Sequence, residues 1–206
     1  MESLAAEIKE IRKGVLKATV DKRLGEFREL GKGKAEKLFK ELCFCLLTAN
    51  YSAEGGIRIQ KSIGDGFLKL PREELASMLR KLGHRFPEAR AGYIVSARKH
   101  MDSFDEVLSK SGNDARNWLV KNVKGLGYKE ASHFLRNIGF NELAIVDFHI
   151  VDILVRNSLI ERPKTITPKK YIEIENILRN LGKSAGMNMA ELDLYLWYME
   201  TGKVLK

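Results

Sequence analysis

Amphipathic helical periodicity runs through almost all of the 206 residues and constrains the fold more than any other feature of this sequence. Apolar residues recur at intervals of three or four positions, which places them on one face of an α-helix, whereas the alternation typical of a strand is nearly absent. The predicted helices are Glu36 to Tyr51, Pro71 to Leu82, Pro87 to Met101, Asn113 to Asn122, Lys129 to Ile138, Asp147 to Ser158, Thr167 to Leu181 and Asn188 to Thr201. We therefore predict an all-α protein.

Capping residues mark several of the predicted helix ends. Thr167 can cap a helix that has Pro168 at its first position, because a threonine hydroxyl accepts from the unpaired amides of the first turn. Gly83, Gly139 and Gly182 stand where helices are predicted to end, since glycine readily adopts the left-handed conformation found there. Caps and periodicity therefore indicate the same boundaries.

No long linker, low-complexity tract or internal repeat interrupts the chain. We expect a continuous fold of two helical lobes, with residues 35–140 in a central lobe that contains a helix-hairpin-helix at about residues 113–139. Residues 1–34 and 141–206, which include the first and last helices, are expected to form the second lobe. The apolar run at residues 143–146 directly precedes a capping aspartate, which favours a buried connector over a strand.

Charge and composition limit the classes of partner. Lys and Arg number 36 against 27 Asp and Glu, and the formal charge of +9 favours an anionic partner such as nucleic acid. The basic residues alternate with acidic ones, so much of this charge is also typical of a solvated helix surface. The sequence has no membrane-spanning run and no export signal, so we expect a cytoplasmic, prokaryotic, nucleoid-associated protein. The 31% content of charged residues favours a thermophilic source.

The cysteines and histidines argue against a metal or cofactor. Cys43 and Cys45, the only cysteines, point about 200° apart on a helix, so we expect buried thiols rather than a disulfide. Two cysteines exclude a four-cysteine iron-sulfur cluster, and the histidines show no metal-ligand spacing. Because no heptad seam or surplus apolar face stands out, a monomer is expected.

The segment from Val123 to Tyr128 predicts a hairpin between two helices. Gly125 and Gly127 permit backbone angles that expose successive amides beside the start of the next helix. Such amides at a helix N-terminus bind phosphate without reading sequence. The alternative is an ordinary interhelical turn that merely needs glycine.

Lys129 and Asp147 are the candidate catalytic pair. Lys129 lies in the first turn of its predicted helix, where the macrodipole disfavours a cation and favours the neutral, nucleophilic amine. Asp147 caps the next helix at the edge of an apolar run, where a partly desolvated carboxylate can exchange a proton or stabilise positive charge on a sugar. A solvated lysine and a plain helix cap are the structural alternatives, and His149 is either a core residue or a phosphate contact. Together the pair indicates base-excision chemistry on DNA.

These residues resemble the helix-hairpin-helix DNA glycosylase superfamily, whose signature is a glycine-rich hairpin, a lysine just after it and a distal V-D-x-H. Further segments resemble the archaeal-type 8-oxoguanine DNA glycosylase/lyase, and the similarity extends from about Phe39 to Lys206. The absence of a cysteine quartet separates the chain from endonuclease III. The matching segments are Leu46-Leu47-Thr48-Ala49-Asn50, Gly83-His84-Arg85-Phe86, Glu130-Ala131-Ser132-His133-Phe134-Leu135-Arg136-Asn137 and Leu192-Asp193-Leu194-Tyr195-Leu196-Trp197-Tyr198.

The resemblance implies an active site between two lobes that acts on double-stranded DNA containing oxidised guanine. Lys129 is then expected to displace the damaged base, form a Schiff base and allow β-elimination, with Asp147 assisting both stages. The DNA backbone is expected to contact Val123, Gly125, Gly127 and His149.

The remaining roles also come from the resemblance. Asn50 is expected to enter the space left by the extruded base, while Arg85 and Phe86 contact the opposite cytosine and wedge the stack, or Phe86 stacks on the extruded base. The damaged-base pocket is expected to contain His133, Asp193, Trp197 and Lys206. Without the resemblance, Trp197 would be assigned to a core stripe and Lys206 to a frayed terminus.

Phe148 departs from the pattern, because relatives usually carry a basic side chain there, and this puts a local phosphate contact in doubt. Two other functions stay open at this point. The first is a noncatalytic helix-hairpin-helix module that binds DNA irrespective of damage. The second is the same enzyme chemistry on another lesion, such as an oxidised pyrimidine.

Overall fold

The computed structural model describes residues 1–206 as helices and connecting loops with no strand, which confirms the all-α prediction. None of these helices has the length and apolar character needed to span a bilayer. In chain order they are α1 (Glu2–Lys13), α2 (Leu16–Gly31), α3 (Ala35–Thr48), α4 (Ala53–Ile63), α5 (Gly66–Lys69), α6 (Arg72–Lys81), α7 (Pro87–Ala97), the 3-10 helix η1 (Arg98–Ser103), α8 (Phe104–Leu108), α9 (Gly112–Asn122), α10 (Tyr128–Asn137), α11 (Phe148–Arg156), α12 (Pro168–Ala185) and α13 (Met189–Thr201).

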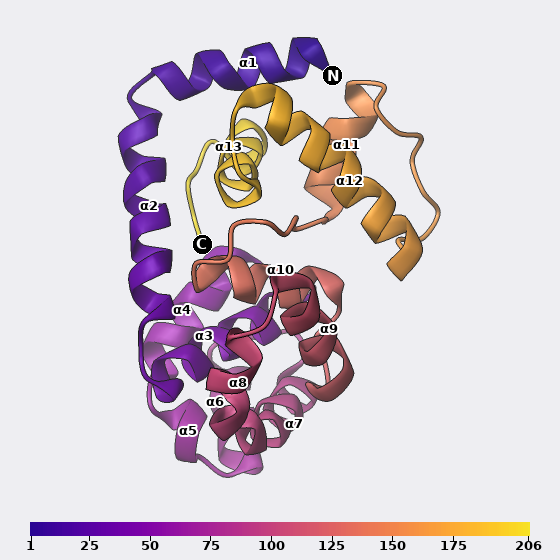
Figure 1. The fold of residues 1–206 in the computed structure, drawn as a ribbon. Helices are drawn as coiled ribbons and strands as arrows, with labels where there is room; N and C mark the ends of the chain where they lie inside the picture. The colour runs from indigo at the N-terminus through magenta and orange to yellow at the C-terminus, as the bar shows by residue number, and fades with distance from the viewer.

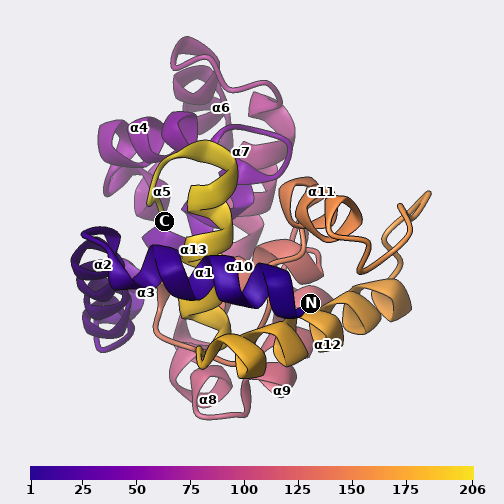
Figure 2. The same ribbon diagram turned by 90° about the horizontal axis from the view of Figure 1, so that it is seen from above.

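The helices form two lobes, each with its own buried core (Figure 1). One core draws its residues from positions 38–143, and the other combines positions 4–27 with positions 144–196. Helix α2 runs along the side of the molecule from one lobe to the other, and α1 lies across α12 and α13 (Figures 1 and 2). The two lobes are therefore shown, whereas the exact divisions at 34/35 and 140/141 stay predictions.

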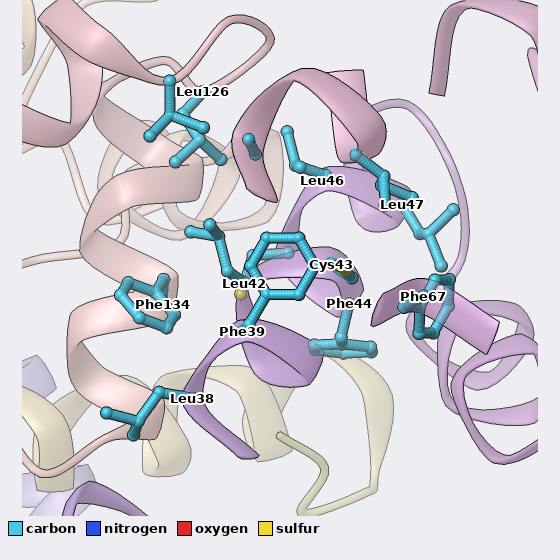
Figure 3. Packing of buried hydrophobic residues seen from close by; sticks show 14 of the residues in the cluster. Leu38, Phe39, Leu42, Cys43, Phe44, Leu46, Leu47, Phe67, Leu126 and Phe134 are labelled. Carbon is cyan, nitrogen blue, oxygen red and sulfur yellow. The ribbon is translucent and has the colours of Figure 1, made fainter. Parts of the chain in front are cut away.

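Helix α3 is the centre of the first core (Figure 3). Every residue from 41 to 49 is buried, because α4, α7 and α10 all pack against this helix. Close approach of α4 depends on Gly56, where a Cβ atom would lie 2.9 Å from Cγ2 of Thr48. The thiols of Cys43 and Cys45 are free and buried in this core, as predicted.

Most predicted caps are present. The hydroxyl of Thr167 accepts from the amide of Lys170 at 3.2 Å, and Pro168 is the first residue of α12. Gly83 and Gly139 follow helix ends with φ values of +81° and +101°. The predicted residues are found at these helix ends, so local capping chemistry sets these helix boundaries.

The assignment of Gly182 to a helix end was wrong. Helix α12 continues to Ala185, and Gly186, with a φ of +69°, ends it. Gly182 serves close packing instead, because a Cβ atom there would lie 3.1 Å from the carbonyl oxygen of Met187. A glycine needed for close approach carries the same sequence signal as one needed for a turn.

The run at residues 143–146 is a buried, non-strand connector, as predicted. Helix α12 holds it in place: the amide of Ala144 donates to Glu175 Oε2 at 2.9 Å, and the amide of Val146 donates to the Tyr171 hydroxyl at 3.1 Å. Side chains therefore satisfy backbone groups that a sheet would otherwise pair. The connector brings residue 147 to the interface of the two lobes.

Candidate active site

The hairpin joins α9 to α10 and has the predicted helix-hairpin-helix form. Gly125 has a φ of +94°, and a Cβ atom there would lie 2.3 Å from Cδ2 of Tyr93. Glycine is thus required both for the backbone angle and for the space. Gly127 is the N-cap of α10, and its amide donates to Glu130 Oε2 at 3.2 Å. The Glu130 carboxylate therefore already accepts a hydrogen bond from one of the amides at this helix N-terminus.

Lys129 lies in the first turn of α10, as predicted. Its side chain is 27% exposed, and Nζ lies 3.9 Å from Glu130 Oε1. The amine therefore does not extend into bulk solvent but lies at the wall of a cavity. His133 and Arg136, four and seven residues further along the same helix, share its face.

Asp147 caps α11, with Oδ1 accepting from the amide of Ile150 at 3.0 Å. Its carboxylate lines the same cavity as Lys129. The connector carries Asp147 from the second core, whereas the hairpin carries Lys129 from the first. The two candidate catalytic groups therefore meet only because the lobes are packed together.

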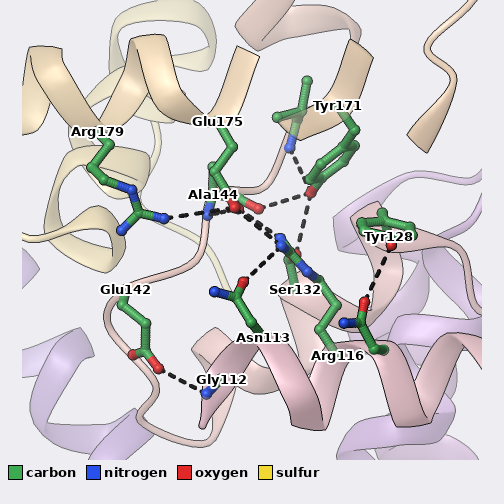
Figure 4. Close-up of polar contacts among 12 residues, drawn as sticks. Gly112, Asn113, Arg116, Tyr128, Ser132, Glu142, Ala144, Tyr171, Glu175 and Arg179 are labelled. Atoms are coloured by element: carbon green, nitrogen blue, oxygen red, sulfur yellow. Dashed lines mark hydrogen bonds and ion pairs between the residues drawn. The ribbon is translucent and has the colours of Figure 1, made fainter. Parts of the chain in front are cut away.

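A buried polar network fixes the lobes behind these groups (Figure 4). The guanidinium of Arg116 on α9 makes two hydrogen bonds to the carboxylate of Glu175 on α12, at 2.6 and 3.1 Å. Glu175 in turn accepts from the connector amide of Ala144, and the hydroxyl of Tyr171 contacts Ser132 on α10 at 3.3 Å. The network thus links both hairpin helices, the connector and α12.

The cavity has a volume of about 1140 Å³ and lies between the lobes. Most of the predicted site residues line it, although they come from the α3–α4 turn, the hairpin, α10, the connector, α11, α13 and the C-terminus. The lining residues among them are Asn50, Gly127, Lys129, His133, Asp147, His149, Asp193, Trp197 and Lys206. Val123 and Gly125, which form the outer part of the hairpin, do not line the cavity.

His133 contributes a neutral imidazole to the cavity wall. Its side chain is buried, and neither ring nitrogen has a hydrogen-bond partner in the protein. Burial, followed by the positive charges of Arg136, Lys129 and Lys206, holds the pKa of His133 well below its usual value. The imidazole is therefore uncharged at neutral pH, and the surrounding protein covers both ring nitrogens.

Asp193 forms an ion pair with Arg136, with 3.4 Å between Oδ2 and Nη2. The pKa of Asp193 is raised to about 6, chiefly by burial; the charge of Arg136 lowers it, that of Asp147 raises it, and that of Lys129 lowers it. These four side chains therefore act on one another electrostatically. Sequence analysis did not assign a role to Arg136, although its position seven residues after Lys129 places it on the cavity side of α10.

Lys206 lines the cavity as predicted, but its ammonium group is bound to the first lobe. Nζ donates to Glu41 Oε2 at 2.7 Å and to Gln60, and it lies 4.2 Å from the ring centroid of Phe44. Glu41 is only 3% exposed and also accepts from Asn137 at 2.6 Å. Neither Glu41 nor Gln60 was among the predicted site residues, although an acidic residue inside an apolar helical run was an available signal for Glu41.

Three aromatic rings follow one another at the second-lobe side of the cavity. The ring of Phe148 lies 4.0 Å from that of His149, and His149 meets Trp197 edge-on at 4.9 Å. The indole nitrogen of Trp197 is buried without a partner. The sequence left open whether His149 is a core residue or a phosphate contact. The structure places it at the cavity rather than in the core.

Asn50 lies in the turn after α3 with a φ of +58°, a conformation that asparagine tolerates better than most residues. The adjoining loop of residues 83–86 is tied to this turn, since His84 Nε2 lies 2.9 Å from the carbonyl oxygen of Leu47. Arg85 and Phe86 are on this loop outside the cavity, and the Arg85 guanidinium lies 5.1 Å from the Phe86 ring centroid. The structure therefore places them on a loop that is tied to the helix before Asn50, and neither side chain lines the cavity of Lys129.

No group of three or more His, Cys, Asp or Glu side chains in the chain has a metal-binding arrangement. The expectation that the protein needs no metal or cofactor stays a prediction.

Comparison with known proteins shows a family match over most of the chain. The model of the 8-oxoguanine DNA glycosylase family matches residues 20–187. The 8-oxoguanine DNA glycosylase/AP lyase of Methanocaldococcus jannaschii is 54% identical over 205 residues, covering 98% of this chain and 99% of that protein. The protein with the same description from Korarchaeum cryptofilum is 49% identical over 209 residues, covering 100% of this chain and 99% of that protein. The crystal structure of the M. jannaschii 8-oxoguanine glycosylase/lyase in complex with 15mer DNA containing 8-oxoguanine superposes with a TM-score of 0.96, covering 99% of this chain and 100% of that chain at 54% identity.

Proposed function

This chain belongs to the 8-oxoguanine DNA glycosylase family, and we propose that it excises 8-oxoguanine from double-stranded DNA and then cleaves the strand at the resulting abasic site. The observation that carries this proposal is that Lys129 and Asp147, which belong to different lobes, line one cavity. An amine and a carboxylate in one cavity supply the nucleophile and the proton acceptor of a bifunctional glycosylase.

Lys129 provides the covalent step. Its neutral ε-amine attacks C1′ of the damaged nucleotide, the glycosidic bond breaks, and the base leaves with the bonding electrons and takes up a proton. Loss of protons from Nζ and opening of the sugar ring give an imine between Nζ and C1′. Removal of a proton from C2′ then expels the 3′ phosphate, which is β-elimination. Covalent catalysis divides one difficult cleavage into easier steps.

Asp147 supports both stages. One carboxylate oxygen accepts from the Ile150 amide, which fixes the orientation of the side chain, and the cavity-facing carboxylate stabilises positive charge that develops on the sugar. The same group accepts a proton as the amine becomes an imine. A helix cap is a suitable place for such a group because the backbone holds it rigidly.

The cavity also contains groups suited to an everted base, which must leave the stack before it can react. Trp197 supplies a ring for stacking, His133 supplies an uncharged imidazole in the cavity wall, and Asp193 with a pKa of about 6 exchanges between acceptor and donor forms close to neutral pH. Of the remaining groups, the hairpin amides and His149 are suited to the DNA backbone, and Asn50, Arg85 and Phe86 to the opposite strand.

Borohydride trapping tests the proposal. With duplex DNA that carries 8-oxoguanine opposite cytosine, borohydride reduction of the imine should yield a covalent protein–DNA complex. Lys129→Gln should abolish the complex, while Lys124→Gln, which removes a nearby hairpin lysine outside the cavity, should retain it. Binding without trapping would indicate a noncatalytic DNA-binding module, and trapping only with an oxidised pyrimidine would indicate another lesion.

Cofactor use and location complete the proposal. We expect full activity in the presence of EDTA, because the covalent chemistry needs only the protein's amine and carboxylate. Action on chromosomal DNA implies a location in the cytoplasm of a prokaryotic cell, in association with the nucleoid. Both points are expectations from the proposed reaction.

A further inference from the structure

Phe148 is an exposed aromatic side chain at the entrance to the cavity. It is 65% exposed, whereas Phe86 at 38% is the only other aromatic residue classed as exposed. Phe148 is the first residue of α11, directly after Asp147, and it lines the cavity. Single exposed apolar residues are common on protein surfaces, but this one adjoins the candidate catalytic carboxylate.

Neighbouring rings restrict the orientation of Phe148. His149 lies against it with 4.0 Å between ring centroids and 36° between ring planes, and Trp197 holds His149 edge-on from inside the cavity. Contact with His149 covers part of the phenyl ring. The rest of the ring is exposed and can contact a partner. A ring that is already ordered loses little conformational freedom when a second ring stacks on it.

Phe148 shares the cavity lining with two apolar residues near the start of α12. Ile166, which is 37% exposed, and Pro168 at the start of α12 line the same cavity. No lysine or arginine makes a cation–π contact with the Phe148 ring, whose aromatic neighbour is His149. This part of the rim therefore suits the face of a base better than a phosphate.

We propose that Phe148 stacks on a nucleobase next to the everted nucleotide, as a contact that is independent of base sequence. The proposal rests on the function proposed above, because it requires a damaged DNA strand to enter the cavity. Eversion removes one stacking partner from each adjacent base, and every base has a π-face that an aromatic ring can cover. Phe148 is then a positioning residue for the reaction, since it holds the strand while Lys129 reaches C1′.

Salt dependence distinguishes stacking from phosphate binding. A phosphate contact releases counterions, so its loss changes the slope of log binding constant against log salt concentration, whereas loss of a stacking contact leaves the slope unchanged. Binding is measured in a Lys129→Gln background to prevent turnover, with duplex DNA containing 8-oxoguanine, over a range of salt concentrations. Phe148→Ala should raise Kd by about tenfold at every salt concentration. Phe148→Trp should bind as tightly as the parent, and Phe148→Arg should steepen the slope by about one phosphate contact.

Ile172→Ala is the matched control, because Ile172 is also exposed, at 36%, but lies on α12 outside the cavity. It should leave Kd unchanged. Thermal unfolding of each variant checks that the fold is intact, which is expected because Phe148 contributes little to the core. The control therefore separates a specific base contact from a general loss of exposed apolar surface.

A fluorescent base identifies the stacking partner. 2-Aminopurine placed on either side of the lesion loses a stacking partner on eversion, so at one of the two positions its emission should be lower in the parent complex, where Phe148 stacks on it and quenches it, than in the Phe148→Ala complex, and Phe148→Trp should restore the quenching. The proposal is overturned if Phe148→Ala binds within twofold of the parent, if it changes the salt slope, or if quenching is unaltered. It is also overturned if Phe148→Ala changes only the sedimentation of the protein, which would assign the ring to a contact between protein copies.

Borohydride trapping with the unmodified protein on the same duplex separates this proposal from the proposed function. Trapping together with unaltered binding by Phe148→Ala overturns only the stacking contact. Absence of both binding and trapping by the unmodified protein overturns both proposals.

Discussion

Arg116 and Glu175 form a buried ion pair that joins the two lobes directly behind the candidate active site. Their side chains are 2% and 3% exposed, and the guanidinium makes two hydrogen bonds to the carboxylate (Figure 4). Both belong to helices that position candidate catalytic groups: α9 precedes the hairpin and α12 holds the connector. The pair therefore links lobe packing to the geometry of Lys129 and Asp147.

Breaking this pair on one side should strongly destabilise the protein. Glu175→Gln leaves the Arg116 charge buried without its counterion, which costs about 3–5 kcal/mol of unfolding free energy. Arg116→Met with Glu175→Leu removes both charges and should recover most of the loss. Chemical denaturation of the two variants measures this difference. An exposed pair, Lys170 with Glu173, provides the control, since Glu173→Gln should leave the unfolding free energy nearly unchanged. Equal losses for Glu175→Gln and the double variant would contradict the expectation.

Asp193 should make stability fall as pH rises from about 4 to 6. The pKa of this carboxyl group is about 6 in the folded protein and 3.8 as the reference value, so the folded state binds more protons within this interval. Unfolding free energy must then decrease with increasing pH, by up to about 3 kcal/mol from this group alone. Stability measured against pH should show this decrease, and Asp193→Asn should reduce it. An unchanged pH profile in Asp193→Asn would show that another group is responsible.

Glu41 should affect excision of the base more than cleavage at an abasic site. Glu41→Gln removes the charge that holds Lys206 Nζ at 2.7 Å, so the C-terminal residue loses its position in the cavity. Excision of 8-oxoguanine should fall by about tenfold to a hundredfold, as expected for a displaced contact to the reacting group. Cleavage of DNA with a preformed abasic site should change little, because no base remains to be recognised.

Deletion of Lys206 provides the matched comparison for Glu41→Gln. The two changes should give similar losses, and their combination should add little, because they remove one interaction. A parallel decrease in abasic-site cleavage would instead assign Glu41 to the stability of the first core.

Gly125→Ala should weaken both the fold and DNA binding. The positive φ costs about 1–3 kcal/mol for a residue with a Cβ atom, and the new atom also displaces the ring of Tyr93. Gly64→Ala is the control, since Gly64 has a φ of +51° but open space around its Cβ position. Thermal unfolding and DNA binding should both change more for Gly125→Ala. Equal effects of the two substitutions would show that backbone strain alone matters.

Local signals were sufficient where chemistry between near neighbours decides the structure. The hairpin and the cap at Asp147 depend on residues within a few positions of one another, and both are present as predicted. The position of Lys129 in the first turn of its helix follows from the same hairpin. By contrast, α1, α2, α4, α5 and α8 were absent from the predicted helices. Helix α2 buries only Val20 and Phe27, and α4 has two glycines in its first turn, so their periodicity and propensity were weak.

Contacts between residues far apart in the chain could not be predicted from the sequence. Lys206 and Glu41 are 165 positions apart, and Arg116 and Glu175 are 59 apart. Nothing in the neighbourhood of Glu41 indicates that its partner is the last residue of the chain. Arg136 was the most accessible of the missed residues, because helical geometry alone places it on the face of Lys129.

By itself the sequence determined the helical class, the turn that requires Gly125, and the nucleophile and carboxylate whose spacing resembles a DNA glycosylase. Those features depend on backbone preferences and on short-range hydrogen bonds, which are the same whatever the tertiary packing of the segment. Only the tertiary structure decided that Lys129 and Asp147 share a cavity, that Lys206 is held by Glu41, and that Phe148 remains exposed beside them. Packing of two separate cores produced these results, because burial and long-range electrostatics arise only after distant segments meet.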